Sequence, residues 1–147
     1  FLLAAAGFRV QMFEVNPVVA ALLADGLARA RRNPALTAIA ERIRLTACDA
    51  RSALGNLDEH PEVIYLDPMF PARGKQALPG KRMQYLAALV ATAVGDRPLD
   101  DWIARAIGVA RRRVVVKRRL HDRPGVAPDW QIRGRSIRYD VYRGTAE

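Results

Sequence analysis

The stretch that decides the fold reads Val63-Ile64-Tyr65-Leu66-Asp67-Pro68-Met69-Phe70-Pro71. Its apolar and aromatic first half is typical of a short, fully buried β-strand. Asp67 follows at the point where this strand would leave the sheet, and the prolines behind it stiffen the exit. Because open α/β sheets bind ligands at the carboxyl ends of their strands, Asp67 is a candidate functional residue.

Strand and helix patterns alternate on both sides of this stretch. Apolar runs predict strands over residues 9–15, 43–48, 62–66 and 114–117. Apolar residues at helical spacing predict helices over 17–32, 83–94 and 99–110, with short helical pieces over 35–40 and 51–57. Two further strands, over 130–133 and 137–142, predict a hairpin around Gly134-Arg135. This order predicts an α/β fold: a mostly parallel sheet with helices on both faces and an antiparallel edge.

The two long helices that flank the central stretch each have a face that we expect to be buried. In the helix over 17–32 this face consists of Val19, Leu22, Leu23, Gly26, Leu27 and Ala30. In the helix over 99–110 it consists of Leu99, Trp102, Ile103, Ala106, Ile107 and Ala110. Asn16-Pro17 is typical of a helix start. Gly7 is typical of a helix end, so the apolar residues before it predict the end of a helix.

The composition indicates a basic globular protein. The chain has 147 residues, of which 50% are hydrophobic, and we expect residues 1–147 to form a single domain. Its formal net charge of +9 favours a nucleic acid as partner, ahead of an anionic membrane. Cys48 is the single cysteine, which suits the reducing cytoplasm, and we interpret it as a core residue. His60 and His121 are isolated, so no metal site is predicted, and no segment approaches the roughly 18 apolar residues of a membrane span.

Three acidic residues stand at the carboxyl ends of predicted strands: Glu14, Asp49 and Asp67. In a parallel sheet the carboxyl ends of the strands lie along one rim, so we expect these carboxylates on the same side of the sheet. An acid at this position in a nucleotide-binding unit accepts hydrogen bonds from ribose hydroxyls, which is the role predicted for Glu14. Asp49 could accept from an adenine amino group. Alternatively, each acid caps a turn or a helix.

The segment Asp67-Pro68-Met69-Phe70 resembles the Asp/Asn-Pro-Pro-aromatic motif of class I methyltransferases that modify exocyclic amines. The chemistry explains the residue types. Asp67 and the Pro68 carbonyl can accept hydrogen bonds from the two amine N–H groups, which orients the nitrogen and stabilises the positive charge that develops on it. Phe70 can stack on the base once the base has left its helix. These three residues are the catalytic candidates, and this chemistry needs no metal.

Four stretches together are similar to the ribosomal small-subunit methyltransferase J family (RsmJ): EVNPVVAALL over 14–23, YLDPMFP over 65–71, VVVKR over 114–118 and RYDVYRGT over 138–145. The resemblance implies a class I, Rossmann-like methyltransferase domain with S-adenosyl-L-methionine as cofactor. It also implies transfer to the N2 amine of guanine 1516 in 16S rRNA, as free RNA or within a small-subunit precursor. Carried over, Glu14, Asp49 and Asp67 would contact the cofactor.

The resemblance also implies that part of the family's sequence lies upstream of Phe1. The family's glycine-rich cofactor loop and first strand should precede this residue, so we expect the chain to be the C-terminal part of a longer protein. In the family, that strand lies between the strand that ends at Glu14 and the strand that ends at Asp67. We therefore expect weak cofactor binding, or none, from the 147-residue chain by itself.

Basic residues flank the Asp67 turn and the end of a neighbouring strand. Those predicted to bind RNA phosphates are Arg73, Lys75, Lys81, Arg82, Lys117 and Arg118. The alternative is a solvated basic surface. Three other functions stay open at the sequence level: a non-catalytic RNA-binding module, a methyltransferase acting on another nucleic-acid amine, and a nicotinamide-dependent oxidoreductase. The oxidoreductase ranks lowest because it leaves the Asp67-Pro68-Met69-Phe70 motif without a role.

Overall fold

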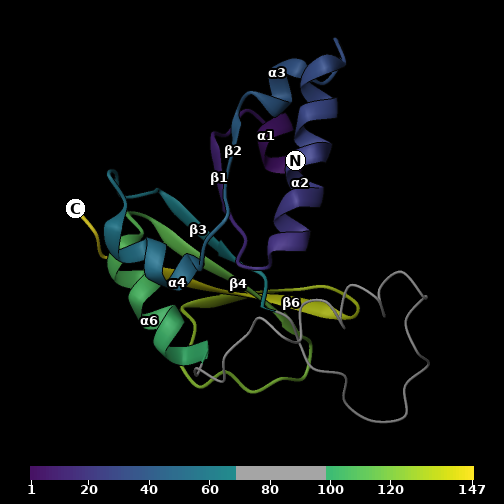
Figure 1. Cartoon of the computed structure of the whole chain (residues 1–147). Helices are drawn as coiled ribbons and strands as arrows, with labels where there is room; N and C mark the ends of the chain where they lie inside the picture. The colour runs from purple at the N-terminus through teal and green to yellow at the C-terminus, as the bar shows by residue number, and fades with distance from the viewer. Residues whose placement is uncertain (69–98) are drawn as a thin grey trace. The chain divides into compact units, whose positions relative to one another are not determined.

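The computed structural model describes residues 1–68 and 99–147. These residues belong to two compact units, Phe1–Ala53 and residues 54–68 with 99–147, which we describe separately. Figure 1 shows the helices and strands of each unit. The helix predicted over 83–94 lies outside the described residues, as do Phe70, Arg73, Lys75, Lys81 and Arg82. No helix in the described ranges is long and apolar enough to cross a membrane.

The described part of the first unit, Phe1–Ala53, contains two parallel strands and four helices. Its elements are α1 (Leu2–Ala5), β1 (Val10–Phe13), α2 (Pro17–Arg32), α3 (Thr37–Ala40), β2 (Ile43–Thr46) and α4 (Ala50–Ala53). Strands β1 and β2 pair in parallel from Val10 opposite Ile43 to Phe13 opposite Thr46. Gly7 follows α1 with φ +97°, a left-handed conformation that glycine adopts without strain, so the predicted helix end is confirmed.

Helix α2 begins where the sequence predicts. The Asn16 side chain accepts hydrogen bonds from the backbone N–H groups of Val18 and Val19 at 3.0 and 3.2 Å, and Pro17 occupies the first turn. The predicted buried face is only partly confirmed. Leu27 and Ala30 are buried, but 61% of Leu22 and 37% of Leu23 are exposed.

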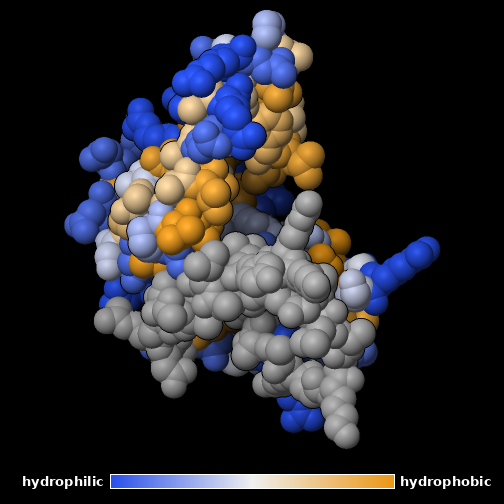
Figure 2. Space-filling model, turned by 45° about the vertical axis from the view of Figure 1, so that its right-hand side comes forward, coloured by the Kyte–Doolittle hydropathy of each residue, from blue (hydrophilic) through white to orange (hydrophobic). Residues whose placement is uncertain are grey.

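This difference has a physical cause. Among the described residues of the first unit, α2 packs against the four-residue elements α3 and β2, which are too short to cover the whole apolar stripe of a sixteen-residue helix. Figure 2 shows hydrophobic residues of this unit as an orange band at its surface, beside blue hydrophilic ones.

The second unit is a four-stranded mixed sheet. Its elements are η1 (Leu54–Asn56), β3 (Val63–Leu66), α6 (Leu99–Val109), β4 (Arg113–Arg119), β5 (Trp130–Arg133) and β6 (Ile137–Arg143). The strand order is β3-β4-β6-β5: β3 and β4 are parallel, and β6 is antiparallel to both of its neighbours. The predicted hairpin and antiparallel edge are therefore confirmed.

Helix α6 and one face of this sheet form the core of the second unit. Ile103, Ala106 and Ala110 pack with sheet residues that include Val114 and Val116, which confirms the buried face predicted for this helix. The prediction of a fully buried β3 was wrong. Ile64 and Leu66 are buried, but 48% of Val63 and 44% of Tyr65 are exposed. Successive side chains of a strand point to opposite faces, and in the described residues α6 covers only the face of Ile64 and Leu66.

Candidate active site

Asp67 follows the last residue of β3, at the carboxyl end of a parallel strand as predicted. Leu66 lies opposite Val116 of β4, so the next residues along the two strands, Asp67 and Lys117, are neighbours on one face. Lys117 Nζ donates a hydrogen bond to Asp67 Oδ2 at 3.0 Å. The Asp67 side chain is 49% exposed and that of Lys117 31%, so both members of the pair are accessible to a ligand. Pro68, whose carbonyl is a catalytic candidate, is half-buried.

Two tyrosines accompany the ion pair on this face of the sheet. Tyr65 lies two residues before Asp67, and Tyr139 of β6 is the direct partner of Lys117. Their ring centroids are 6.4 Å apart. Partial burial, followed by the nearby charges of Asp67 and Tyr139, raises the pKa of Tyr65 to about 12. Tyr65 is therefore protonated at neutral pH and can act there as a hydrogen-bond donor.

Glu14 and Asp49 lie in the first unit, after the two strands that pair in parallel. The Glu14 backbone N–H donates to the Thr46 carbonyl at 3.2 Å, which extends the pairing of β1 and β2 by one residue. Glu14 Oε1 accepts from the Asn16 backbone N–H at 2.8 Å, and Asp49 Oδ1 accepts from the Arg51 backbone N–H at 2.9 Å. Each acid thus fixes the turn behind its strand, which is the capping role that the sequence left as an alternative.

These contacts are compatible with a ribose site at Glu14. Its carboxylate is half-buried and held at Oε1 by a backbone N–H, and its second oxygen can accept from hydroxyl groups. The structure brings Glu14 and Asp49 to the same end of the β1–β2 sheet. Asp67 belongs to the other unit. In the described part of the chain, no group of three or more His, Cys, Asp or Glu residues could hold a metal ion.

The prediction that Arg118 binds RNA phosphate does not fit its position in the structure. Its side chain is only 7% exposed, and its guanidinium lies 3.2 Å from Asp140 and 3.7 Å from Asp100. Arg118 alternates with Lys117 along β4 and therefore points to the face of the sheet that α6 covers. A buried cation paired with two acids has a structural role. Lys117 remains at the opposite face, beside Asp67.

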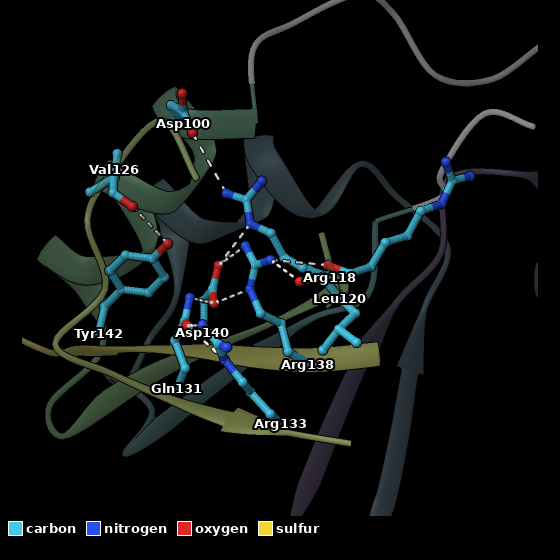
Figure 3. Close-up of polar contacts among 10 residues, drawn as sticks. Asp100, Arg118, Leu120, Val126, Gln131, Arg133, Arg138, Asp140 and Tyr142 are labelled. Carbon is cyan, nitrogen blue, oxygen red and sulfur yellow. Dashed lines mark hydrogen bonds and ion pairs between the residues drawn. The ribbon is translucent and has the colours of Figure 1, made fainter. Parts of the chain in front are cut away.

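The sequence reasoning also missed the charged cluster around Asp140, drawn in Figure 3. Asp140 is 0% exposed and accepts from Arg138 Nε at 2.8 Å, Arg138 Nη2 at 3.1 Å and Gln131 Nε2 at 2.7 Å. Arg138 also donates to the backbone carbonyls of Arg119 and Leu120, at 3.1 and 2.7 Å. The cluster ties the β5–β6 hairpin to the end of β4. The signal available in the sequence was an arginine and an aspartate, Arg138 and Asp140, two residues apart on one face of a predicted strand, a spacing that allows an ion pair.

The chain matches a known protein family over nearly its whole length. Residues 1–144 match the family model described as SAM-dependent methyltransferase, where SAM is S-adenosylmethionine. The chain belongs to this family. Its mixed sheet with an antiparallel hairpin is consistent with the class I, Rossmann-like methyltransferase fold. The cofactor of the family is S-adenosyl-L-methionine, as the resemblance found in the sequence implies.

Relatives within the methyltransferase family agree with this assignment. The Ribosomal RNA small subunit methyltransferase J of Thioalkalivibrio sulfidiphilus is 45% identical over 97% of this chain and 56% of its own length. That of Alkalilimnicola ehrlichii is 48% identical over 98% of this chain and 56% of its own length. A solved SAM-dependent methyltransferase from Neisseria gonorrhoeae is 35% identical and superposes with a TM-score of 0.75, over 97% of this chain and 55% of that one. The chain thus spans a little over half the length of these relatives.

Proposed function

We propose that the protein transfers a methyl group from S-adenosyl-L-methionine to the exocyclic N2 of a guanine in 16S rRNA, guanine 1516 being the target that the family resemblance implies. The observation that carries the proposal is the similarity to relatives named Ribosomal RNA small subunit methyltransferase J, at 41–48% identity over nearly the whole chain. The accessible Asp67 carboxylate at a strand end supports it, because an exocyclic amine needs an acceptor at such a position. The partner would be 16S rRNA or a precursor of the small ribosomal subunit.

The residues of this chain would hold the amine and prepare it for attack. Asp67 and the Pro68 carbonyl accept hydrogen bonds from the two N–H groups, which points the nitrogen lone pair away from them. As the nitrogen bonds to the methyl carbon it gains positive charge, and the Asp67 carboxylate stabilises this charge through its hydrogen bond. The nitrogen then loses one proton, to Asp67 or to water, and the methylated amine is neutral. Phe70 would stack on the guanine, although it lies outside the described residues.

Bound S-adenosyl-L-methionine would supply an electrophilic methyl group, with a neutral thioether as the leaving group. Glu14 would accept hydrogen bonds from the ribose hydroxyls, since its carboxylate already sits at a strand end with one oxygen fixed by Asn16. Asp49 would approach the adenine amino group, and Asp67 would lie where cofactor and amine meet. The basic loop residues Arg73, Lys75, Lys81 and Arg82 would hold phosphates, and they too lie outside the described residues.

The proposal is tested with Asp67→Ala in the full-length protein. Methyl transfer from labelled S-adenosylmethionine to 16S rRNA, free and in small-subunit particles, should fall by at least about 100-fold, because the amine loses its charged acceptor. Glu62→Ala is the matched control: Glu62 is an exposed acid that pairs with Arg112 beside the other end of the same strand. Mapping the product identifies the nucleotide and atom. If Asp67→Ala transfers methyl groups as fast as the wild type, Asp67 has no part in the mechanism. If the wild-type protein binds RNA but transfers no methyl group, the result favours the non-catalytic RNA-binding module.

A further inference from the structure

The ion pair at the end of β3 gives Lys117 a partner that the sequence did not predict. Lys117 Nζ lies 3.0 Å from Asp67 Oδ2, across 50 residues of sequence. We propose that Lys117 is a positioning residue: it holds the Asp67 carboxylate through Oδ2 and leaves Oδ1 to accept the hydrogen of the target amine. The inference rests on the function proposed above for Asp67. It replaces the prediction that Lys117 binds an RNA phosphate.

The backbone brings the two groups together. Strands β3 and β4 are parallel and in register through Leu66 and Val116, so Asp67 and Lys117 follow as neighbours on one face. Lys117 is held from the other side as well, because β6 places Tyr139 directly opposite it. The ammonium group therefore stands on a central strand of the sheet, which gives it a fixed position from which to orient a side chain at the strand end.

The ion pair with Asp67 separates this role from phosphate binding. A lysine that binds phosphates on a duplex or loop presents its ammonium group to solvent, where the polyanion can reach it. The Lys117 side chain is 31% exposed, and its ammonium group is already paired with Asp67 at 3.0 Å, so a phosphate would have to compete with that carboxylate.

The pair has a direct consequence for the proposed reaction. The carboxylate torsion of an aspartate is broad and roughly two-fold, so an unpaired Asp67 would rotate among several orientations. Pairing one oxygen with Lys117 selects the orientation in which the other oxygen faces the amine. A misplacement of about 1 Å in such a site can cost about 100-fold in rate. A half-exposed ion pair contributes little to folding stability, so the loss of Lys117 should affect turnover rather than the fold.

The test compares Lys117→Met, Lys117→Arg and the control Arg112→Met in the full-length protein, with 16S rRNA as substrate. Arg112 also forms an ion pair with an acid, Glu62, but its side chain is 63% exposed and precedes the opposite end of β4. We expect Lys117→Met to lower kcat by about 100-fold, with KM for RNA within about threefold of wild type. Lys117→Arg should recover much of the loss because it restores the cation, and Arg112→Met should retain wild-type turnover.

Two further measurements separate the possible outcomes. In the Asp67→Asn background, adding Lys117→Met should cost little more, because both changes remove the same interaction. Exchange of the Lys117 ammonium hydrogens with water, followed by NMR, should be slow in the wild type and faster in Asp67→Ala. An increase in KM at unchanged kcat, with the salt slope of RNA binding lowered by about 1, would overturn the inference in favour of a phosphate contact. A wild-type protein without methyl transfer would overturn the proposed function and this role with it.

Discussion

Replacing Asp140 with Asn should strongly destabilise the second unit. Asp140 is fully buried and accepts three hydrogen bonds, at 2.7, 2.8 and 3.1 Å, while Arg118 lies 3.2 Å away. The substitution keeps the side-chain shape but removes the negative charge that faces two buried guanidinium groups. The hydrogen bond with Asp140 raises the pKa of Arg138 above its ordinary value, and burial opposes this rise only in part. Arg138 therefore stays charged. Removing one partner of a buried ion pair costs about 3–5 kcal/mol, and we expect a loss of this size.

The assay is equilibrium urea unfolding of the full-length protein, followed by circular dichroism and tryptophan fluorescence. Glu62→Gln is the matched control, because the same chemical change there removes an acid from an exposed pair with Arg112, 3.7 Å away. Its cost should stay within about 1 kcal/mol. Adding Arg138→Met to Asp140→Asn should recover part of the stability, since it removes one of the uncompensated charges. If Asp140→Asn costs no more than Glu62→Gln, the argument that the buried cluster holds the hairpin is refuted.

Three smaller predictions concern single positions. Gly144→Ala should destabilise the protein by about 1–3 kcal/mol, because the new Cβ would collide with the Ala110 carbonyl oxygen. Gly108→Ala in α6 places its Cβ where no atom lies within 4 Å, so it should stabilise the protein by about 0.5–1 kcal/mol. Thermal unfolding distinguishes the two variants. Asn16→Ala should cost about 1 kcal/mol in urea unfolding by removing the α2 cap, and an unchanged midpoint would contradict the capping role. The pKa of Tyr65 rises from 10.0 to about 12 on folding, so the contribution of the protonated phenol to folding stability is complete below pH 10 and is lost as pH rises toward 12. Tyr65→Phe should flatten this part of the plot of stability against pH. A plot that Tyr65→Phe leaves unaltered would contradict the shift.

Local signals in the sequence determined most of the element order. The cap at Asn16, the glycine at Gly7 and the apolar period of α6 act within a few residues, so they can be identified before the fold is known. The same holds for Asp67, because a short apolar run that ends in an acid is typical of a strand end in an α/β protein. The resemblance of its neighbours to known methyltransferases then supplied the chemistry, which composition and spacing alone could not.

The tertiary structure decided which of these side chains meet. Lys117 and Arg118 are adjacent and alike in the sequence, yet the alternation along β4 sends one to Asp67 and the other to the buried Asp140. Pairing between segments about 50 residues apart decides which residue of β3 lies opposite Val116. The same pairing decides which face of β4 is covered by α6. Local propensity carries no information about such pairing, because register and burial are set by the packing of the whole sheet. The sequence by itself determined that Asp67 lies at a strand end, whereas the pairing of Asp67 with Lys117 was decided only by the tertiary structure.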